Sequence, residues 1–383
     1  MIDKRLRLMT DLHLKFLGSI CLAILIIILI VGLWPFNFFP KNKVTWLPDK
    51  NGVCFPGQSM ILSLDPLNDP QQSLLNKKTI TIEILIRPTE EPQGDINRIL
   101  SMYDEKSSEI TFLSQWKKHL IIRSRTKRTD ANRWYREIGI DDAFRKEQDY
   151  LLSVVSGKEG TTLYINGQPV KTYPRHHLLD SITSKKVSSI LGNSPVGKHS
   201  WKGRVMELAI YNRSFTPEEI FEHYQSYLEN NFTMSSKKEE GHIGLYLFNE
   251  KLGATVHDYS NLNNHLTIPA IFRPVQRIIL ALPGQDFRWD KSFVQDTVIN
   301  LLGFIPVGFF FTAFLLKAGH WKRMTIYIGV AAAGFMISLA IELLQIYLPS
   351  RNSQLNDVIC NAVGTVLGIL ILHLLMQNKK IHL

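Results

Sequence analysis

The distribution of apolar positions divides the chain into two kinds of segment. Four largely apolar runs have the length of about 20 residues that a helix needs to cross roughly 30 Å of hydrocarbon. Between the first two runs, short segments alternate apolar and polar positions with a period of two, which is typical of β-strands. The sequence therefore predicts an α-helical membrane bundle and an all-β domain. The predicted transmembrane helices are residues 16–34, 296–316, 325–348 and 357–376.

The first apolar run could also be a cleaved signal peptide, because basic residues precede it. The run is longer than the apolar core of a usual signal peptide, and no Ala-x-Ala cleavage site follows it. An aromatic stretch comes next instead, Trp34-Pro-Phe-Asn-Phe-Phe-Pro40, and aromatic residues concentrate at membrane interfaces. We therefore expect an uncleaved anchor.

The net charge is +10, and much of the basic excess lies beside the predicted spans. It is concentrated in residues 1–15, in the loop 317–325 and in the tail from residue 377. If the first span runs outward, all three segments lie on one side, as the positive-inside rule requires for short loops. We therefore expect a multi-pass protein of the bacterial inner (cytoplasmic) membrane, with both termini cytoplasmic and the β domain periplasmic or extracellular. Because the membrane accounts for this charge, no nucleic-acid partner is predicted.

The predicted all-β domain covers residues 49–270. Residues 79–87 alternate apolar and polar side chains, and Asn166–Gly167 supplies the two positive φ angles of a type I′ hairpin. Thr216 and Glu219 form a capping box, which predicts the start of a helix. Many short strands with almost no helix predict a β-sandwich.

Three motifs of this domain resemble laminin G-like domains of the concanavalin A-like lectin/glucanase superfamily. They are Tyr164-Ile-Asn-Gly167, Ile190-Leu-Gly192 and the stretch 201–220. Residues 244–253 resemble a strand-and-turn element that precedes the sandwich in many relatives and follows it here. The resemblance implies a jelly-roll sandwich that binds carbohydrate or protein.

Acidic residues of the domain do not form the Glu-x-Asp-x-x-Glu pattern with which glucanases of this superfamily cleave glycosidic bonds. Glu83 and Glu207 are single acids on predicted strands, and we expect them on a solvated strand face.

Two further groups have alternative interpretations. One could bind calcium through its oxygens or form an Asx-rich turn, and we favour the turn, so no metal and no cofactor is predicted. The members of this group are Asp258, Asn261, Asn263 and Asn264. The other group could stack on sugar rings or belong to the core, and we favour the core. Its members are Trp116, Trp134 and Trp201.

Polar residues inside the predicted spans point to a second site. The second and fourth spans both begin with Asp-x-x-x-Asn-x-x-Gly, whose offsets place the three residues on one helix face. The glycines, Gly303 and Gly364, are expected to allow close approach of another helix.

Glu342 lies in the third predicted span, where a charged acid costs roughly 2.5 to 3.5 kcal/mol at the centre of a membrane. We expect Glu342 to face the bundle interior with Arg351, just after the helix, as its partner. Polar residues of the three spans converge on the outer leaflet as a candidate ligand site or as interhelical hydrogen-bonding groups. The candidate site comprises Asp296, Asn300, Glu342, Gln345, Arg351, Asp357 and Asn361.

The spacing of these residues, with Trp34-Pro-Phe36 after the first span, resembles VanZ-like membrane proteins. The VanZ-like core would cover residues 283–376, and the inserted sandwich departs from the family pattern. The family is named for a protein that gives low-level resistance to the glycopeptide teicoplanin, so the resemblance implies a link to antibiotic resistance without indicating a reaction.

Three functions remain open from the sequence. The first is an envelope protein whose sandwich binds a glycan or protein and whose bundle binds a membrane lipid or a lipid-linked, amphiphilic envelope molecule. The second is a membrane enzyme that uses Glu342 and Asp357 as acid–base groups. The third is a structural scaffold. We assign no catalytic residue and consider an enzyme the less favoured reading.

Overall fold

A computed structural model describes residues 2–70, 72–106, 108–126, 135–229, 241–281, 291–319, 321–351 and 353–378. The chain forms two compact units. One unit combines Met1–Phe39 with Arg277–Leu383, and the other is Pro40–Gln276.

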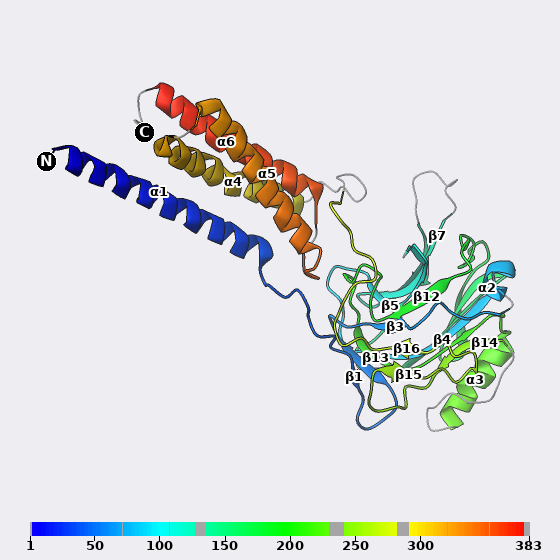
Figure 1. Ribbon diagram of the computed structural model, residues 1–383. Helices are drawn as coiled ribbons and strands as arrows, with labels where there is room; N and C mark the ends of the chain where they lie inside the picture. Colours follow the sequence, from blue (N-terminus) through cyan, green and yellow to red (C-terminus); the bar gives the residue numbers. More distant parts are fainter. Residues whose placement is uncertain are drawn as a thin grey trace. The chain divides into compact units, whose positions relative to one another are not determined.

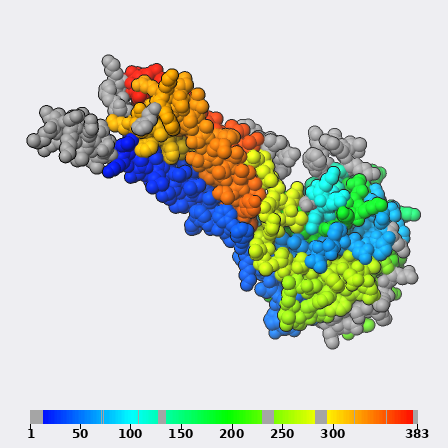
Figure 2. All heavy atoms as spheres, in the orientation of Figure 1, coloured from blue at the N-terminus to red at the C-terminus, as the bar shows by residue number. Residues whose placement is uncertain are grey.

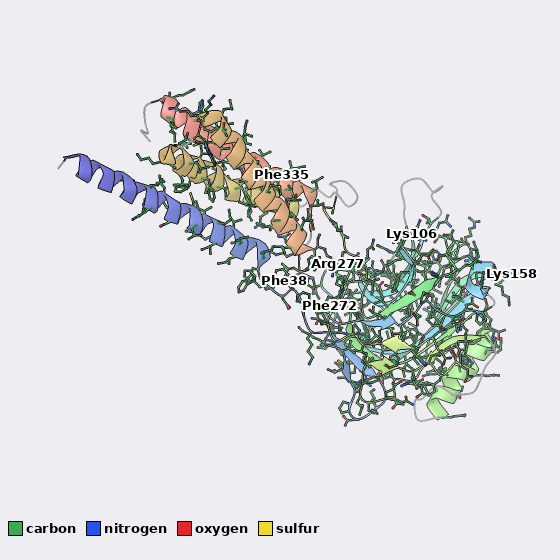
Figure 3. All side chains as sticks on the ribbon, viewed as in Figure 1. Phe38, Lys106, Lys158, Phe272, Arg277 and Phe335 are labelled. Atoms are coloured by element: carbon green, nitrogen blue, oxygen red, sulfur yellow. The ribbon has the colours of Figure 1, made fainter. Side chains whose placement is uncertain are left out.

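The first unit is a bundle of long helices (Figure 1). Its helices are α1 (Ile2–Leu33), α4 (Lys291–Ala318), α5 (Arg323–Gln345) and α6 (Leu355–Gln377). All four contain a segment long and apolar enough to cross a membrane. Many apolar side chains on the bundle surface remain exposed, such as Phe335 of α5 at 43 % (Figure 3). The chain is therefore a multi-pass membrane protein.

The contact between α4 and α6 is the most extensive in the bundle. It depends on glycine, because a Cβ atom at Gly364 would overlap the carbonyl oxygen of Leu301, and one at Gly368 would overlap that of Ile305. Gly308 of α4 approaches the backbone of α6 in the same way. Small residues allow this close packing of helix backbones inside membranes.

The expected role of Gly364 is thus confirmed, whereas the expectation for Gly303 was wrong. A Cβ atom at Gly303 would meet nothing within 4 Å. The reason is helix geometry: Gly308 lies five residues further on, about 140° around the helix, and this turns it rather than Gly303 towards α6.

Helix α1 packs against α4 and α5, as the blue and orange surfaces in Figure 2 show. Gly18 lies against the ring of Phe314, and Gly32 lies against Ile341. Leu33, Phe304 and Ile341 form part of the apolar core where the three helices meet.

The second unit consists of two antiparallel sheets. The first sheet has the strand order β1 (Thr45–Trp46), β2 (Val53–Pro56), β13 (Lys202–Tyr211), β4 (Ile80–Pro88), β9 (Tyr150–Gly157), β10 (Gly160–Ile165) and β11 (Gln168–Tyr173), with β14 (His242–Tyr246) also paired to β13. The second has the order β15 (Thr255–Val256), β16 (Leu266–Thr267), β3 (Ile61–Ser63), β12 (Val187–Leu191), β5 (Asn97–Asp104), β6 (Glu109–Trp116), β7 (His119–Arg125) and β8 (Tyr135–Ile140). The predicted jelly-roll-like sandwich is confirmed.

The core of the sandwich follows from the alternation along β4. Ile82, Ile84 and Ile86 belong to the main apolar cluster of the domain. Leu85 points to the opposite face and joins a second cluster with Ile220 of α3 (Pro217–Glu229). Helix α3 therefore covers the outer face of the first sheet, while the short helix α2 (Ser73–Asn76) lies between β3 and β4 in the chain.

Two local predictions are confirmed in detail. Asn166 and Gly167 have φ angles of 51° and 76°, as the β10–β11 hairpin turn requires. At the start of α3, the Thr216 amide donates to the Glu219 carboxylate at 2.7 Å, and the Glu219 amide lies 3.3 Å from the Thr216 hydroxyl. These bonds satisfy backbone donors that a helix start leaves free.

Candidate functional site at the membrane bundle

The seven predicted site residues come from three helices and one loop that meet at the same end of the bundle. Asp296 and Asn300 lie on α4, Glu342 and Gln345 on α5, Arg351 in the following loop, and Asp357 and Asn361 on α6. These residues fall into two sets with different roles. One set stabilises helix ends, and the other set leaves polar groups free.

Glu342 stabilises the start of α6. Its side chain is buried, with 2 % exposed, and Oε2 accepts a hydrogen bond from the backbone N–H of Gln354 at 2.8 Å. Gln354 is the N-cap residue of α6 and makes no cap through its own side chain. A carboxylate is favourable there because the N-terminal end of a helix carries partial positive charge.

Gln345 and Arg351 stabilise the end of α1. Gln345 Nε2 donates to the carbonyl oxygen of Gly32 at 2.9 Å. Arg351 Nε and Nη2 donate to the carbonyl oxygens of Trp34 and Val31, at 3.1 and 3.0 Å. The last carbonyl groups of a helix lack partners within it, and a cation is favourable beside them.

The expected ion pair between Glu342 and Arg351 is therefore not formed. Among the described residues, no ion pair joins Arg351 to any carboxylate within 4.0 Å. The guanidinium of Arg351 hydrogen-bonds to carbonyl groups at the end of α1. It acts on Glu342 only as a nearby charge. The sequence could not show this, because the end of α1 is more than 300 positions away in the chain.

Asp357 and Asn300 connect α6 to α4. Their side chains are hydrogen-bonded, and Asp296, one turn further out on α4, is an electrostatic neighbour of Asp357. Asp296 is exposed and Asp357 is half-buried. A further contact between the same helices joins the Asn356 amide to the Thr297 hydroxyl at 3.4 Å.

Asn361 lies one turn below Asp357 and connects α6 to α5. Asn361 is only 5 % exposed, and its Nδ2 donates to the Ser338 hydroxyl at 2.8 Å. Its Oδ1 atom is buried and has no hydrogen-bond partner. Exchanging the two ends of the amide would leave the nitrogen unpaired instead, so one polar group of Asn361 remains free in either orientation.

A segment that the sequence did not assign to the site holds the α5–α6 loop in place. The Ala281 amide donates to the Ser353 carbonyl at 2.9 Å, and the Leu355 amide donates to the Ala281 carbonyl at 3.1 Å. Arg277, labelled in Figure 3, lies 4.4 Å above the centre of the Tyr347 ring. No periodic pattern marks this segment, because it belongs to no helix or strand.

In the sandwich, the two strand acids are buried, and the expectation of a solvated strand face was wrong. Glu83 is 0 % and Glu207 is 1 % exposed, because both share the sheet face that α3 covers. Glu83 accepts a hydrogen bond from Ser153 at 2.9 Å, and its Oε2 lies 2.7 Å from Nδ1 of His223 on α3. This arrangement keeps Glu83 away from any saccharide in solution.

The oxygen-rich segment after β14 forms a turn, as expected. The Asp258 carboxylate accepts hydrogen bonds from the backbone amides of Leu245, Ser260 and Asn264, each at 2.9 Å. Asn261 and Asn263 have positive φ angles of 70° and 58°. In the part of the chain that the structure describes, no group of three or more His, Cys, Asp or Glu side chains has metal-binding geometry.

Comparison with known proteins agrees with both units. The family description VanZ/LLP1 matches residues 225–376, and the description of the concanavalin A-like lectin/glucanases superfamily matches residues 65–221. The chain combines a VanZ/LLP1 region with a concanavalin A-like lectin/glucanase domain. The VanZ/LLP1 match begins within α3, and it includes β14 to β16 as well as α4, α5 and α6. No curated protein matches the sequence.

Solved structures similar to the chain match parts of it. A heptameric pentraxin from Limulus polyphemus is 15 % identical with a TM-score of 0.35, over 46 % of this chain and 82 % of its own. A predicted carbohydrate-binding protein from Bacteroides ovatus is 14 % identical with a TM-score of 0.40, over 60 % and 62 %. A sialidase from Trypanosoma rangeli is 15 % identical with a TM-score of 0.38, and the match spans 49 % of this chain and 29 % of the sialidase.

The tryptophans of the lectin-like domain differ in exposure. Trp201 is fully buried, and its indole N–H donates to Gln115 at 2.7 Å, so it is a core residue as expected. Trp116 is half-buried and stacks on His119, with ring centres 5.2 Å apart. Trp134 lies outside the described residues. Trp116 therefore keeps some exposed surface, as does Trp46, which is also half-buried in this domain.

Two histidines of the lectin-like domain are held neutral. Burial lowers the pKa of His176 to about 4, and Ser124 Oγ lies 3.0 Å from its Nε2. Burial, with Arg98 nearby, also lowers the pKa of His199 to about 4. Both imidazoles therefore remain uncharged at neutral pH.

Proposed function

We propose that this protein is a binding protein of the bacterial envelope. Its lectin-like domain recognises a glycan or a protein outside the membrane. Its VanZ/LLP1 region binds a lipid-linked or amphiphilic envelope molecule at the outer leaflet. In this proposal both termini are cytoplasmic and the sandwich is periplasmic or extracellular, as the basic residues beside the spans favour.

One observation carries the proposal for the bundle. The polar residues at the end of the spans divide into a capping set and a free set. The capping set, Glu342, Gln345 and Arg351, is hydrogen-bonded to the ends of α1 and α6. The second set, called the free set below, consists of Asp296, Asn300, Asp357 and Asn361, of which the last three also make hydrogen bonds between helices. Asp296 is exposed, and Asn361 retains an unpaired polar atom, so this set has groups left for a ligand.

The free set also argues against a purely structural bundle. Polar groups inside a membrane are costly unless they are paired. A scaffold needs the capping set, because that set fixes the ends of two helices. It does not need an exposed acid next to a second acid on the neighbouring helix.

The alternative of a membrane enzyme has weaker support. Glu342 would have to release its bond to the Gln354 amide before it could transfer a proton to a substrate. Asp357, the second acid of this alternative, is hydrogen-bonded to Asn300 of α4. These contacts suit structural roles for both acids.

The bundle is tested by the molecules that copurify with it. The full chain is isolated in nanodiscs made of its own membrane, and bound lipids are identified by mass spectrometry. We expect a species that is enriched with the native protein and reduced with Asp357→Asn. Asp65→Asn, an exposed position in the sandwich, removes the same charge and should keep the species. An identical lipid profile for all three proteins would support the scaffold instead.

Ligand binding by the lectin-like domain is tested with the isolated domain. Residues 40–276, applied to an array of bacterial envelope glycans, should bind a subset of them, and Trp116→Ala should weaken that binding. Capture of a defined envelope protein, with no glycan bound, would favour the protein ligand.

A link to glycopeptide tolerance is tested by deleting the gene and measuring the minimal inhibitory concentration of teicoplanin. Unchanged susceptibility would remove that link.

A further inference from the structure

The charges at the end of α4 and α6 that carries Asp296 and Asp357 indicate what kind of headgroup could bind there. Three carboxylates lie at this end, those of Asp296, Glu342 and Asp357. Among the described residues, none of them forms an ion pair within 4.0 Å. The described cations nearby are engaged, Arg351 with the carbonyls of α1 and Arg277 with the Tyr347 ring. Arg351 keeps its charge and acts on Glu342, so among the described residues the acidic part of the site is the pair Asp296 and Asp357.

The unpaired group of Asn361 is a second, independent sign of a ligand. Asp357 and Asn361 are four residues apart on α6, and Ser338 and Glu342 are four residues apart on α5. The Asn361–Ser338 hydrogen bond joins these two faces, so Asn361 lies between α5 and α6, one turn below Asp357 and Glu342. A buried polar atom without a partner is unfavourable, and a bound molecule that donates to it removes that cost.

We infer that the acidic end of α4 and α6 binds the ammonium group of an amine-bearing amphiphile, an inference that rests on the proposed amphiphile site. An ammonium group has three N–H donors and no acceptor, so it complements carboxylate and amide oxygens. A phosphate or carboxylate would place an anion against Asp296 and Asp357. Near the low dielectric of the membrane, that repulsion is stronger than in water.

The neighbouring surface of α4 suits the apolar chain of such a molecule. Ile299 and Leu302, on the first turns after Asp296, are 52 % and 57 % exposed. Gly303 adds a position where no side chain fills the surface, since a Cβ atom there would meet nothing within 4 Å. An alkyl chain can therefore lie along α4 while its headgroup meets Asp296 and Asp357.

Two probes of equal chain length test the inference, dodecylamine and dodecyl phosphate. Their binding to the full chain in zwitterionic nanodiscs is measured by equilibrium dialysis, with empty nanodiscs subtracted. We expect dodecylamine to bind more tightly than dodecyl phosphate. We expect Asp296→Asn and Asp357→Asn each to weaken dodecylamine binding by about tenfold, because each removes one charge-assisted contact. Asp65→Asn should change nothing.

The outcomes separate the inference from the proposed function. Tighter binding of dodecyl phosphate, or unchanged dodecylamine binding in both bundle variants, overturns the amine while leaving an amphiphile site. Binding of neither probe overturns the amphiphile site itself. Asp296→Asn distinguishes a loss of binding from a loss of folding, because Asp296 is exposed and its replacement leaves the helix contacts intact.

Discussion

Arg351 donates a hydrogen bond from Nε to the carbonyl oxygen of Trp34, at 3.1 Å and across 317 positions of the chain. A second bond, from Nη2, reaches the carbonyl of Val31. The loop after α5 thus holds the end of α1 against the bundle.

This contact predicts that Arg351→Ala loosens the end of α1. The amides of residues 30–34 and 36 should exchange hydrogen faster, because two of the three carbonyls at the end of α1 that Arg351 and Gln345 cap would lose their donor. Arg351→Lys should give an intermediate rate, since lysine keeps the favourable charge but lacks the planar fork that reaches two carbonyls. Hydrogen–deuterium exchange with mass spectrometry measures the rates. Native rates in Arg351→Ala would show that the cap does not hold α1.

Glu342 predicts a difference between two substitutions. Glu342→Ala leaves the Gln354 amide without its partner and should lower the free energy of unfolding by about 1 to 3 kcal/mol. Glu342→Gln keeps an acceptor oxygen and loses only the charge beside the helix end, which costs under about 1 kcal/mol. Thermal unfolding of the purified protein in detergent, followed by circular dichroism, compares them. Equal losses in both variants would contradict the capping role.

Glycine-to-alanine substitutions are predicted to be harmful inside the α4–α6 contact and tolerated outside it. Gly364→Ala and Gly368→Ala place a methyl group against the α4 backbone, and such overpacking costs about 1 to 3 kcal/mol. Gly303→Ala meets nothing within 4 Å and serves as the matched control. Melting temperature in detergent and abundance in the membrane measure the effect. If Gly303→Ala is as harmful as Gly368→Ala, the seam does not run where the structure places it.

The buried His176 predicts that the sandwich loses stability in weak acid. Burial lowers the pKa of His176 to about 4 in the folded domain, below the ordinary value of 6.5. As pH falls from about 6.5 to 4, the unfolded chain takes up the proton first, so stability decreases over this range by up to about 3 kcal/mol.

The control for this pH dependence is His176→Gln, whose amide can still reach Ser124 but does not titrate. We expect the difference in unfolding free energy between the native and variant domains, residues 40–276, to change between pH 6.5 and 4. Urea unfolding at several pH values measures it. A constant difference across this range would mean that His176 does not titrate on unfolding.

The proposed topology predicts which positions a membrane-impermeant maleimide can reach. Leu252 of the sandwich is 77 % exposed, and Trp321 of the α4–α5 turn is 66 % exposed. In a cysteine-free background, Leu252→Cys should be labelled on the outer surface, after removal of any outer membrane, and Trp321→Cys only after permeabilisation. The reverse pattern would invert the topology. Two further labelling positions, Lys237 before β14 in the chain and His320 beside Trp321, lie outside the described residues.

The sequence by itself determined the features that depend on neighbours along the chain. The four spans followed from their length and apolarity, the β10–β11 turn from Asn166–Gly167, and the start of α3 from Thr216 and Glu219. The two-residue period of β4 also placed Ile82 and Ile84 on one buried face. Such signals are local, because hydrogen bonding and side-chain direction within one element fix them.

Only the tertiary structure decided what faces each polar residue. Glu83 was expected in solvent, yet α3 packs over it from more than 130 positions away and supplies His223. Arg351 was expected beside Glu342, nine residues earlier, but it reaches the end of α1 instead. The partner of a long polar side chain depends on which distant element arrives beside it, and neither spacing nor composition encodes that arrangement directly.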